Sequence, residues 1–191
     1  MLRAIPFRKL SVAVVAVTIL GACQGGDTDT SANVKDGNAS GSDGTVLTSA
    51  IGDTPELSIS SKLISTAQLG TALDGQGSYT VFLPVDDAWK AVEAADRAAI
   101  ESEENRPQLV ALLRQHIAPG YVVAADFDKG LSNKNGTVSL TTMGAAPIAL
   151  HRDGESITLG QGKDAPKIVG APIVAGNDVV YRIDRLIPPP K

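Results

Sequence analysis

The strongest constraint on the fold is a ten-residue segment, TVFLPVDDAW, which runs from Thr80 to Trp89. Its first half is β-branched and aromatic, which predicts a strand, and Pro84 ends that strand because it has no backbone N–H to donate. Asp86 stands where a helix N-cap accepts unpaired N–H groups, and Asp87 adds a favourable negative charge to the first turn. We expect Trp89 to turn inward onto the core, so the segment predicts a joint between a strand and a helix.

The two adjacent carboxylates of this segment also allow a different interpretation, a catalytic acid pair. Such a pair needs a further group that raises the pKa of one carboxyl group, so that this group can act as an acid. The sequence offers no candidate for that group. We therefore expect Asp86 and Asp87 to serve the fold.

The N-terminus has the order of a bacterial lipoprotein signal. A basic start precedes eleven uncharged residues, Leu10 to Leu20, a run that is short for a membrane span and typical of a signal-peptide core. The next residues, LGAC, resemble the lipobox, whose cysteine is diacylated at sulfur after cleavage before it. We predict a signal peptide over residues 1–22 and lipid attachment at Cys23; the alternative is an ordinary secretory signal with a chance cysteine.

A lipid on Cys23 would attach the protein stably to a membrane of the bacterial cell envelope. Gln24 follows the cysteine at a position where aspartate commonly marks retention in the inner membrane, so the outer membrane is favoured. Since Cys23 is the only cysteine, the folded part can have no disulfide, no thiolate nucleophile and no cysteine-ligated metal.

A polar spacer separates this anchor from the folded part. Residues 23–45 are rich in Gly, Ser, Thr, Asn and Asp and bury too little apolar surface to fold, which predicts a flexible tether. Residues 46–191 have the length of one ordinary domain. Without the signal the chain keeps 14 Lys and Arg against 21 Asp and Glu, a net charge of −7, which gives no electrostatic case for binding nucleic acid.

The hydrophobic pattern predicts helices in the first half of the domain and strands in the second. Helical spacing extends over 59–67, 69–73 and the stretch from Trp89 to about Ile100. A further helix is expected within 103–120, where Pro107 lies near a first helical position and Ala118-Pro119-Gly120 stops the helix. Short strands are expected at Thr137–Thr142, Pro147–Leu150 and Ser156–Leu159, followed by two strands that turn at Gly176–Asp178. This order predicts an α+β domain in which most strand pairs are antiparallel.

Three separated segments resemble the signature regions of the fasciclin domain, in the expected order and spacing. They are YTVFLPVDDAWKAV (Tyr79 to Val92), LVALLRQHIAPGYVVAADF (Leu109 to Phe127) and GNDVVYRIDRLIPPP (Gly176 to Pro190). In the second segment, the resemblance places a helix that ends in histidine and leads through a glycine into a strand. The resemblance implies a compact wedge of small, mostly antiparallel β-sheets flanked by several helices.

The same resemblance implies a domain of adhesion and matrix proteins, with no enzymatic activity and no obligatory cofactor. The central helix of the family commonly carries a Tyr-His pair, but here the pair is Gln115-His116. The histidine matches and the tyrosine does not, and this departure weakens the case for adhesion of the integrin type. His116, Asp86 and Asp184 remain the motif residues that could take part in an interaction.

Histidines are the first candidates for a catalytic base, and the chain has two. His116 continues a stripe of leucines, which favours a packed ring hydrogen-bonded to the backbone. The strands at 147–150 and 156–159 are expected to form a hairpin around Asp153-Gly154; His151 lies beside this turn, and we expect it to be solvated. The carboxylate cluster Glu101–Asn105 is typical of a solvated helix end, and a calcium loop would need different spacing. We therefore predict no catalytic residue, no cofactor and no metal site.

Three functions remain open. The favoured hypothesis is a membrane-anchored interaction or adhesion module, facing the surface or the periplasm, that contacts an envelope or extracellular protein or a polysaccharide. The second is a binder of a small or lipid-like ligand, which predicts an apolar pocket. The third is a hydrolase with an unrecognised site, in which His116 would be required for turnover.

Overall fold

The computed structural model describes residues 44–133 and 136–188 of the chain. The predicted signal peptide, Cys23 and nearly all of the predicted tether lie outside the described residues. In the part that is described, no helix combines the length and the apolar composition needed to cross a bilayer.

Seven α-helices and two short 3₁₀ segments occur within the described residues. All of them except the last helix precede strand β2, Ile117–Pro119, in the sequence. The helices are α1 Leu47–Gly52, α2 Ser58–Thr66, α3 Gly70–Leu73, α4 Asp86–Lys90, α5 Ala94–Glu101, α6 Arg106–Gln115 and α7 Ala124–Asn133, with 3₁₀ turns η1 Pro55–Leu57 and η2 Glu103–Asn105. Pro107 occupies the first turn of α6, as predicted, because the N–H that it lacks would have no partner there.

The strands form two sheets. The four-stranded sheet has the order β2-β1-β7-β6, with β1 Tyr79–Pro84, β2 Ile117–Pro119, β6 Ile168–Ala175 and β7 Asp178–Ile183. The three-stranded sheet has the order β3-β4-β5, with β3 Thr137–Leu140, β4 Ile148–Asp153 and β5 Ser156–Leu159. The β1–β7 pair is parallel and the other pairs are antiparallel, which confirms the predicted α+β class and the mostly antiparallel pairing.

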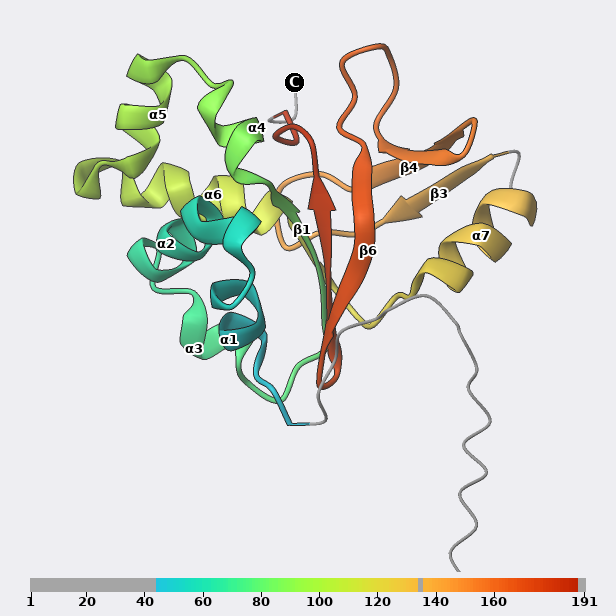
Figure 1. Ribbon diagram of the computed structural model, residues 1–191, viewed down its shortest axis with the longest axis horizontal. Coiled ribbons are helices and arrows are strands. Elements are labelled where there is room, and N and C mark those ends of the chain that lie inside the picture. Colours follow the sequence, from blue (N-terminus) through green and yellow to red (C-terminus); the bar gives the residue numbers. More distant parts are fainter. Residues whose placement is uncertain (1–43, 134–135, 189–191) are drawn as a thin grey trace, which may run out of the picture. The chain divides into compact units, whose positions relative to one another are not determined.

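Helices of the first half lie on one side of the four-stranded sheet, and the three-stranded sheet with α7 lies on the other (Figure 1). Each face contributes buried side chains to a different core. Successive side chains of a strand point to opposite faces, so Val81 and Phe82 enter different cores. One face packs against the helices of the first half; we call this the helical core, which includes Leu47, Ile51, Leu57, Leu63, Ile64, Leu73, Val81, Leu83, Trp89, Leu109, Leu113, Ile117 and Val180.

The opposite face packs against the three-stranded sheet and α7. We call this the sheet core, which consists of Phe82, Phe127, Leu131, Ile148, Leu150, Leu159, Val179, Tyr181, Ile183 and Ile187. All members of both cores lie between Leu47 and Ile187, so this part of the chain contains the apolar interior that an independently folding domain needs.

The helical core is closed by the joint that the sequence predicts. Trp89 is only 1% exposed, which confirms that it turns inward. Its indole N–H donates to Ser60 Oγ at 2.9 Å, and Ser60 Oγ donates to the carbonyl of Pro84 at 2.7 Å. The end of β1, helix α2 and helix α4 are thus connected through one buried hydroxyl.

The sheet core is organised by three aromatic rings. The ring centroids of Phe82 and Tyr181 are 5.6 Å apart, and those of Phe127 and Tyr181 are 5.1 Å apart. Tyr181 Oη donates to the carbonyl of Val122 at 3.0 Å, which satisfies the one polar group of this cluster. Burial raises the pKa of the Tyr181 hydroxyl, so the ring stays neutral.

Two predicted boundaries are wrong. The helix expected to stop at Ala118-Pro119-Gly120 already ends at Gln115, because Ile117–Pro119 pairs with β1 and forms an edge strand. The strand expected after Gly120 is replaced by helix α7, Ala124–Asn133. Phe127 and Leu131 lie one helical turn apart and both enter the sheet core, and this spacing was the sequence signal for α7.

Candidate functional site

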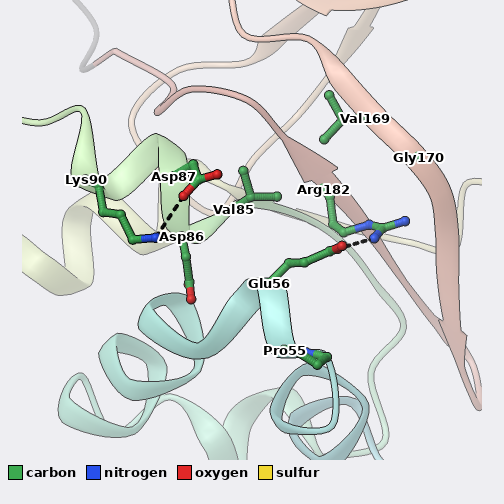
Figure 2. Close-up of a pocket in the computed structure, with 9 residues that line it drawn as sticks. All are labelled: Pro55, Glu56, Val85, Asp86, Asp87, Lys90, Val169, Gly170 and Arg182. Atoms are coloured by element: carbon green, nitrogen blue, oxygen red, sulfur yellow. Dashed lines mark hydrogen bonds and ion pairs between the residues drawn. The ribbon is translucent and has the colours of Figure 1, made fainter.

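The carboxylates of the strand-to-helix joint line a cleft of about 540 Å³ between α4, η1 and the β6–β7 pair, shown in Figure 2. We call it the charged cleft. It is lined by Pro55, Glu56, Val85, Asp86, Asp87, Lys90, Val169, Gly170 and Arg182. The arrangement of its carboxylates decides between the two interpretations of the TVFLPVDDAW segment.

Asp86 does not cap its own helix, which corrects the sequence prediction. Val85 occupies the N-cap position of α4, and Asp86 is already the first helical residue. Its carboxylate instead accepts hydrogen bonds from the backbone N–H of Ile59 at 2.9 Å and from Ser58 Oγ at 2.5 Å. Asp86 therefore satisfies unpaired donors at the N-terminus of α2, where its negative charge is also favourable.

Asp87 extends away from this contact and pairs with Lys90. The carboxylate lies 2.8 Å from the Lys90 ammonium, one turn later on the exposed side of α4. The hydrogen bond to Lys90 lowers the pKa of Asp87, and the same bond raises the pKa of Lys90. The expected negative charge in the first turn is confirmed, and the two adjacent carboxylates serve different partners.

Arg182 forms the opposite wall of the charged cleft. Its guanidinium donates to Glu56 and, at 3.2 Å, to the carbonyl of Ala171. The strand beside it bulges between Val169 and Ile173, and Gly170 has a φ of +68°, where a side chain would overlap the guanidinium. The hydrophobic pattern did not indicate this role of Arg182; the glycine inside strand β6 was the available sequence signal.

His116 is packed as predicted. The residue is 1% exposed; its Nδ1 lies 2.9 Å from the carbonyl of Leu112, and its Nε2 accepts the backbone N–H of Ile187 at 3.1 Å. These partners require a neutral ring with the proton on Nδ1. Burial lowers the pKa of His116 to about 4, against a smaller opposing effect of the hydrogen bond to Leu112. Both ring nitrogens are thus engaged by the backbone.

Gln115, the residue in place of the family's tyrosine, fixes a turn. Its side-chain amide donates to the carbonyl of Ala146 at 2.8 Å and accepts from the Ala146 N–H at 3.4 Å. Thr142 closes the same turn through Oγ1, which donates to the Ala146 carbonyl at 2.7 Å. A Cβ on Gly144 would come within 2.6 Å of the Gln115 side chain, so glycine permits this close approach.

A second hollow lies between α6 and this turn. We call it the apolar groove; its volume is about 570 Å³, and it is lined by Gln108, Ala111, Leu112, Arg114, Gln115, Met143, Gly144 and Ala145. Met143 is 41% exposed. The apolar pocket that the second functional hypothesis expects therefore has a counterpart on the described surface.

The remaining candidate residues serve local structure. Asp184 accepts the N–H of Lys167 at 2.7 Å and donates its own N–H to the Lys167 carbonyl at 3.1 Å, which continues the β6–β7 pairing. His151 is half-buried, with Nδ1 3.0 Å from Thr137 Oγ1, because β3 pairs beside it; the expectation that it is solvated is wrong.

The three predicted motif residues do not converge. Asp86 lines the charged cleft, and neither His116 nor Asp184 does. In the described part of the chain, no group of three or more His, Cys, Asp or Glu side chains is arranged to hold a metal ion. Asp86, His116 and Asp184 each join two elements of the fold through backbone groups.

Comparison with known proteins gives consistent matches. The family model described as Fasciclin domain matches residues 55–189. Protein sll1483 of Synechocystis sp. is 31% identical over 127 residues, which are 66% of this chain and 64% of that protein. Periostin of Homo sapiens is 25% identical over 127 residues, 66% of this chain but only 14% of periostin. This chain thus matches less than two-thirds of the length of each relative.

The fold has a counterpart among solved structures. A FAS1 domain pair from the insect cell adhesion molecule fasciclin I matches with a TM-score of 0.67 and 17% sequence identity, over 76% of this chain and 51% of that chain. At 17% sequence identity, this structural similarity is evidence for the fold alone. It agrees with the α+β arrangement of small sheets and several helices described above.

Proposed function

The chain belongs to the fasciclin domain family, and we propose that it is an interaction and adhesion module without catalytic activity, anchored to the bacterial cell envelope. Fasciclin domains are generally adhesion or interaction modules. The observation that carries the proposal is the match of the family model to residues 55–189, nearly the whole described domain. The fold-level likeness to a domain pair of a cell adhesion molecule supports it.

The uses of the motif residues also support a binding role. The side chains that first suggested chemistry, Asp86 and His116, are occupied by backbone partners at joints of the fold. A general base must reach the proton that it removes, and His116 is buried with both ring nitrogens engaged. What the domain offers to a partner is therefore its surface.

The anchor is proposed from the sequence. A basic start, an uncharged run and small residues before Cys23 are typical of a lipoprotein signal. The polar residues 23–45 would then hold the domain at a distance from the membrane. With Gln24 after the cysteine, the outer membrane is favoured, and the partner would be an envelope or extracellular protein or a polysaccharide.

Attachment of living cells tests the module. A deletion strain, complemented with the wild-type chain or with Cys23→Ser, is compared for surface attachment and aggregation, with envelope integrity measured in parallel. We expect attachment to fall in the deletion strain and to return only with the anchored wild-type chain. Normal attachment of the deletion strain under all conditions would overturn the proposal.

Metabolic labelling tests the anchor separately. Cells that express the wild-type chain or Cys23→Ser are grown with a radiolabelled fatty acid, and the protein is isolated. Label should enter the wild-type protein and not the variant. Equal incorporation, or no incorporation in either, would disprove lipid attachment at Cys23.

A further inference from the structure

We propose that the apolar groove beside α6 binds a small amphiphile that carries one anionic head group on an apolar chain. The groove lies between α6 and the turn formed by residues 142–146. This inference does not rest on the proposed adhesion role, because binding is measured on the purified domain and attachment on cells.

The walls of the groove are fixed before any ligand binds. The turn is held to α6 by the side chain of Gln115 on Ala146 and to strand β2 by the Met143 N–H, which donates to the Ile117 carbonyl at 2.8 Å. Within the turn, the Gly144 N–H donates to Thr142 Oγ1 at 3.1 Å. A preformed site requires little ordering when a ligand binds. Its volume of about 570 Å³ lies within the range of small-molecule pockets.

The lining of the groove favours an apolar chain. Ala111 and Leu112 line it from α6, and Met143 and Ala145 line it from the turn. Alanine side chains are short and leave room. Met143 is 41% exposed, and its unbranched, polarizable side chain can pack around ligands of different shape.

The charge at the groove favours an anionic head group. Arg114 is the only charged residue in the lining, and no carboxylate lines it. Arg152, Arg182 and Arg185 are paired with carboxylates, whereas among the described residues no ion pair is formed by Arg97, Arg106 or Arg114, and of these three only Arg114 lines the groove. Within residues 44–133 and 136–188, no acidic side chain forms an ion pair with Arg114. An unpaired guanidinium beside apolar surface matches a carboxylate or phosphate at the end of an apolar chain.

Three probes at pH 8, each below its micelle concentration, test the head group and the chain. Dodecanoate, octanoate and dodecyltrimethylammonium are titrated into the chain from Gln24 to Lys191, which contains both cores, by calorimetry and by amide chemical-shift mapping. We expect dodecanoate to bind saturably, with shifts in α6 and the turn. Octanoate should bind at least tenfold more weakly, since a fully buried methylene contributes roughly fourfold in affinity. The cation should bind more weakly than dodecanoate.

Variants locate the site. Met143→Asp should weaken dodecanoate binding more than tenfold, because it places a charge against the apolar chain. Ala145→Asp, on the exposed side of the turn, repeats this test if the first variant unfolds. Arg114→Gln should weaken dodecanoate about fivefold and leave the cation unaffected. Lys129→Gln removes an exposed positive charge on α7 and is the matched control, with no expected change.

Any of the following outcomes would overturn the proposal. These are the absence of saturable dodecanoate binding, equal affinity for dodecanoate and the cation, and unchanged dodecanoate affinity in folded Met143→Asp or Ala145→Asp. Chemical shifts confined to the charged cleft would equally exclude the apolar groove. Folding of each variant is checked by its urea unfolding curve.

Discussion

The two cores on either side of the four-stranded sheet are built differently. The helical core gathers several short helices and is closed by a buried polar contact between Trp89 and Ser60. The sheet core gathers segments far apart in the chain around Phe82, Phe127 and Tyr181, and its one hydroxyl reaches a backbone carbonyl. Strands β1 and β7 supply both cores with alternate residues, so one pair of strands links a core made mainly of helices to a core made mainly of strands.

The largest effect is expected in the helical core. Trp89→Ala should lower the free energy of unfolding by about 4–5 kcal/mol, because it removes the largest buried side chain and leaves a cavity. Urea unfolding measures the loss, and native-state hydrogen exchange shows where it acts. Protection should fall first in α2 and α4. An equal loss of protection in β4 and β5 would show that the two cores open as one unit.

The matched change in the sheet core is Phe127→Ala. We expect the free energy of unfolding to fall by a smaller amount, about 3 kcal/mol. Helix α7 lies at the edge of the domain and can move inward to fill part of the space left by the ring. Hydrogen exchange should now increase in α7 and β3, while the amides of α2 keep their protection. A loss larger than that of Trp89→Ala would reverse the ranking of the two cores.

His116 connects the cores, because its ring contacts α6 on one side and Ile187 of the sheet core on the other. Its pKa of about 4 in the folded chain lies below the ordinary value near 6.5, so the unfolded chain binds a proton more readily. Its contribution is therefore complete above pH 6.5 and is lost as the pH falls toward 4. We expect the free energy of unfolding to drop by about 2–3 kcal/mol between pH 7 and pH 4.5.

Urea unfolding at a series of pH values measures this drop, and histidine variants assign it. His116→Gln should flatten the profile between pH 6.5 and 4.5, although its stability at pH 7 will be lower. His151→Gln, which changes the other histidine, should leave the profile unchanged. A steep profile that persists in folded His116→Gln would assign the effect to other groups.

The smallest expected effect concerns the joint on the helical side. Asp86→Ala should lower the free energy of unfolding by about 1 kcal/mol, because two donors at the start of α2 lose their acceptor. Asp87→Ala removes a neighbouring carboxylate that is exposed and paired with Lys90, and it should leave the free energy of unfolding almost unchanged because solvent screens an exposed ion pair. Equal effects of the two substitutions would contradict the different roles assigned to these carboxylates.

Local patterns identified most elements of this fold. The leucine stripe of α6, the hairpins at Gly154 and Gly176, and the joint ending at Trp89 all follow from short-range spacing and turn chemistry. The hydrophobic pattern did not predict the strand at Ile117–Pro119, because this strand forms only through its pairing with β1. It also failed at α7, because Phe127 and Leu131 are the two buried residues of this helix and their spacing alone is a weak signal.

The sequence by itself determined the α+β class, the family, the inward position of Trp89 and the packed state of His116, because each depends on neighbours within a few turns or on motifs in order. Only the tertiary structure decided which donors Asp86 accepts, since they lie 27 and 28 residues away in the chain. It alone also revealed that Arg114 and Met143 line one groove and that, among the described residues, no carboxylate pairs with Arg114. Contacts between distant segments depend on the packing of the whole domain, and no local spacing encodes them.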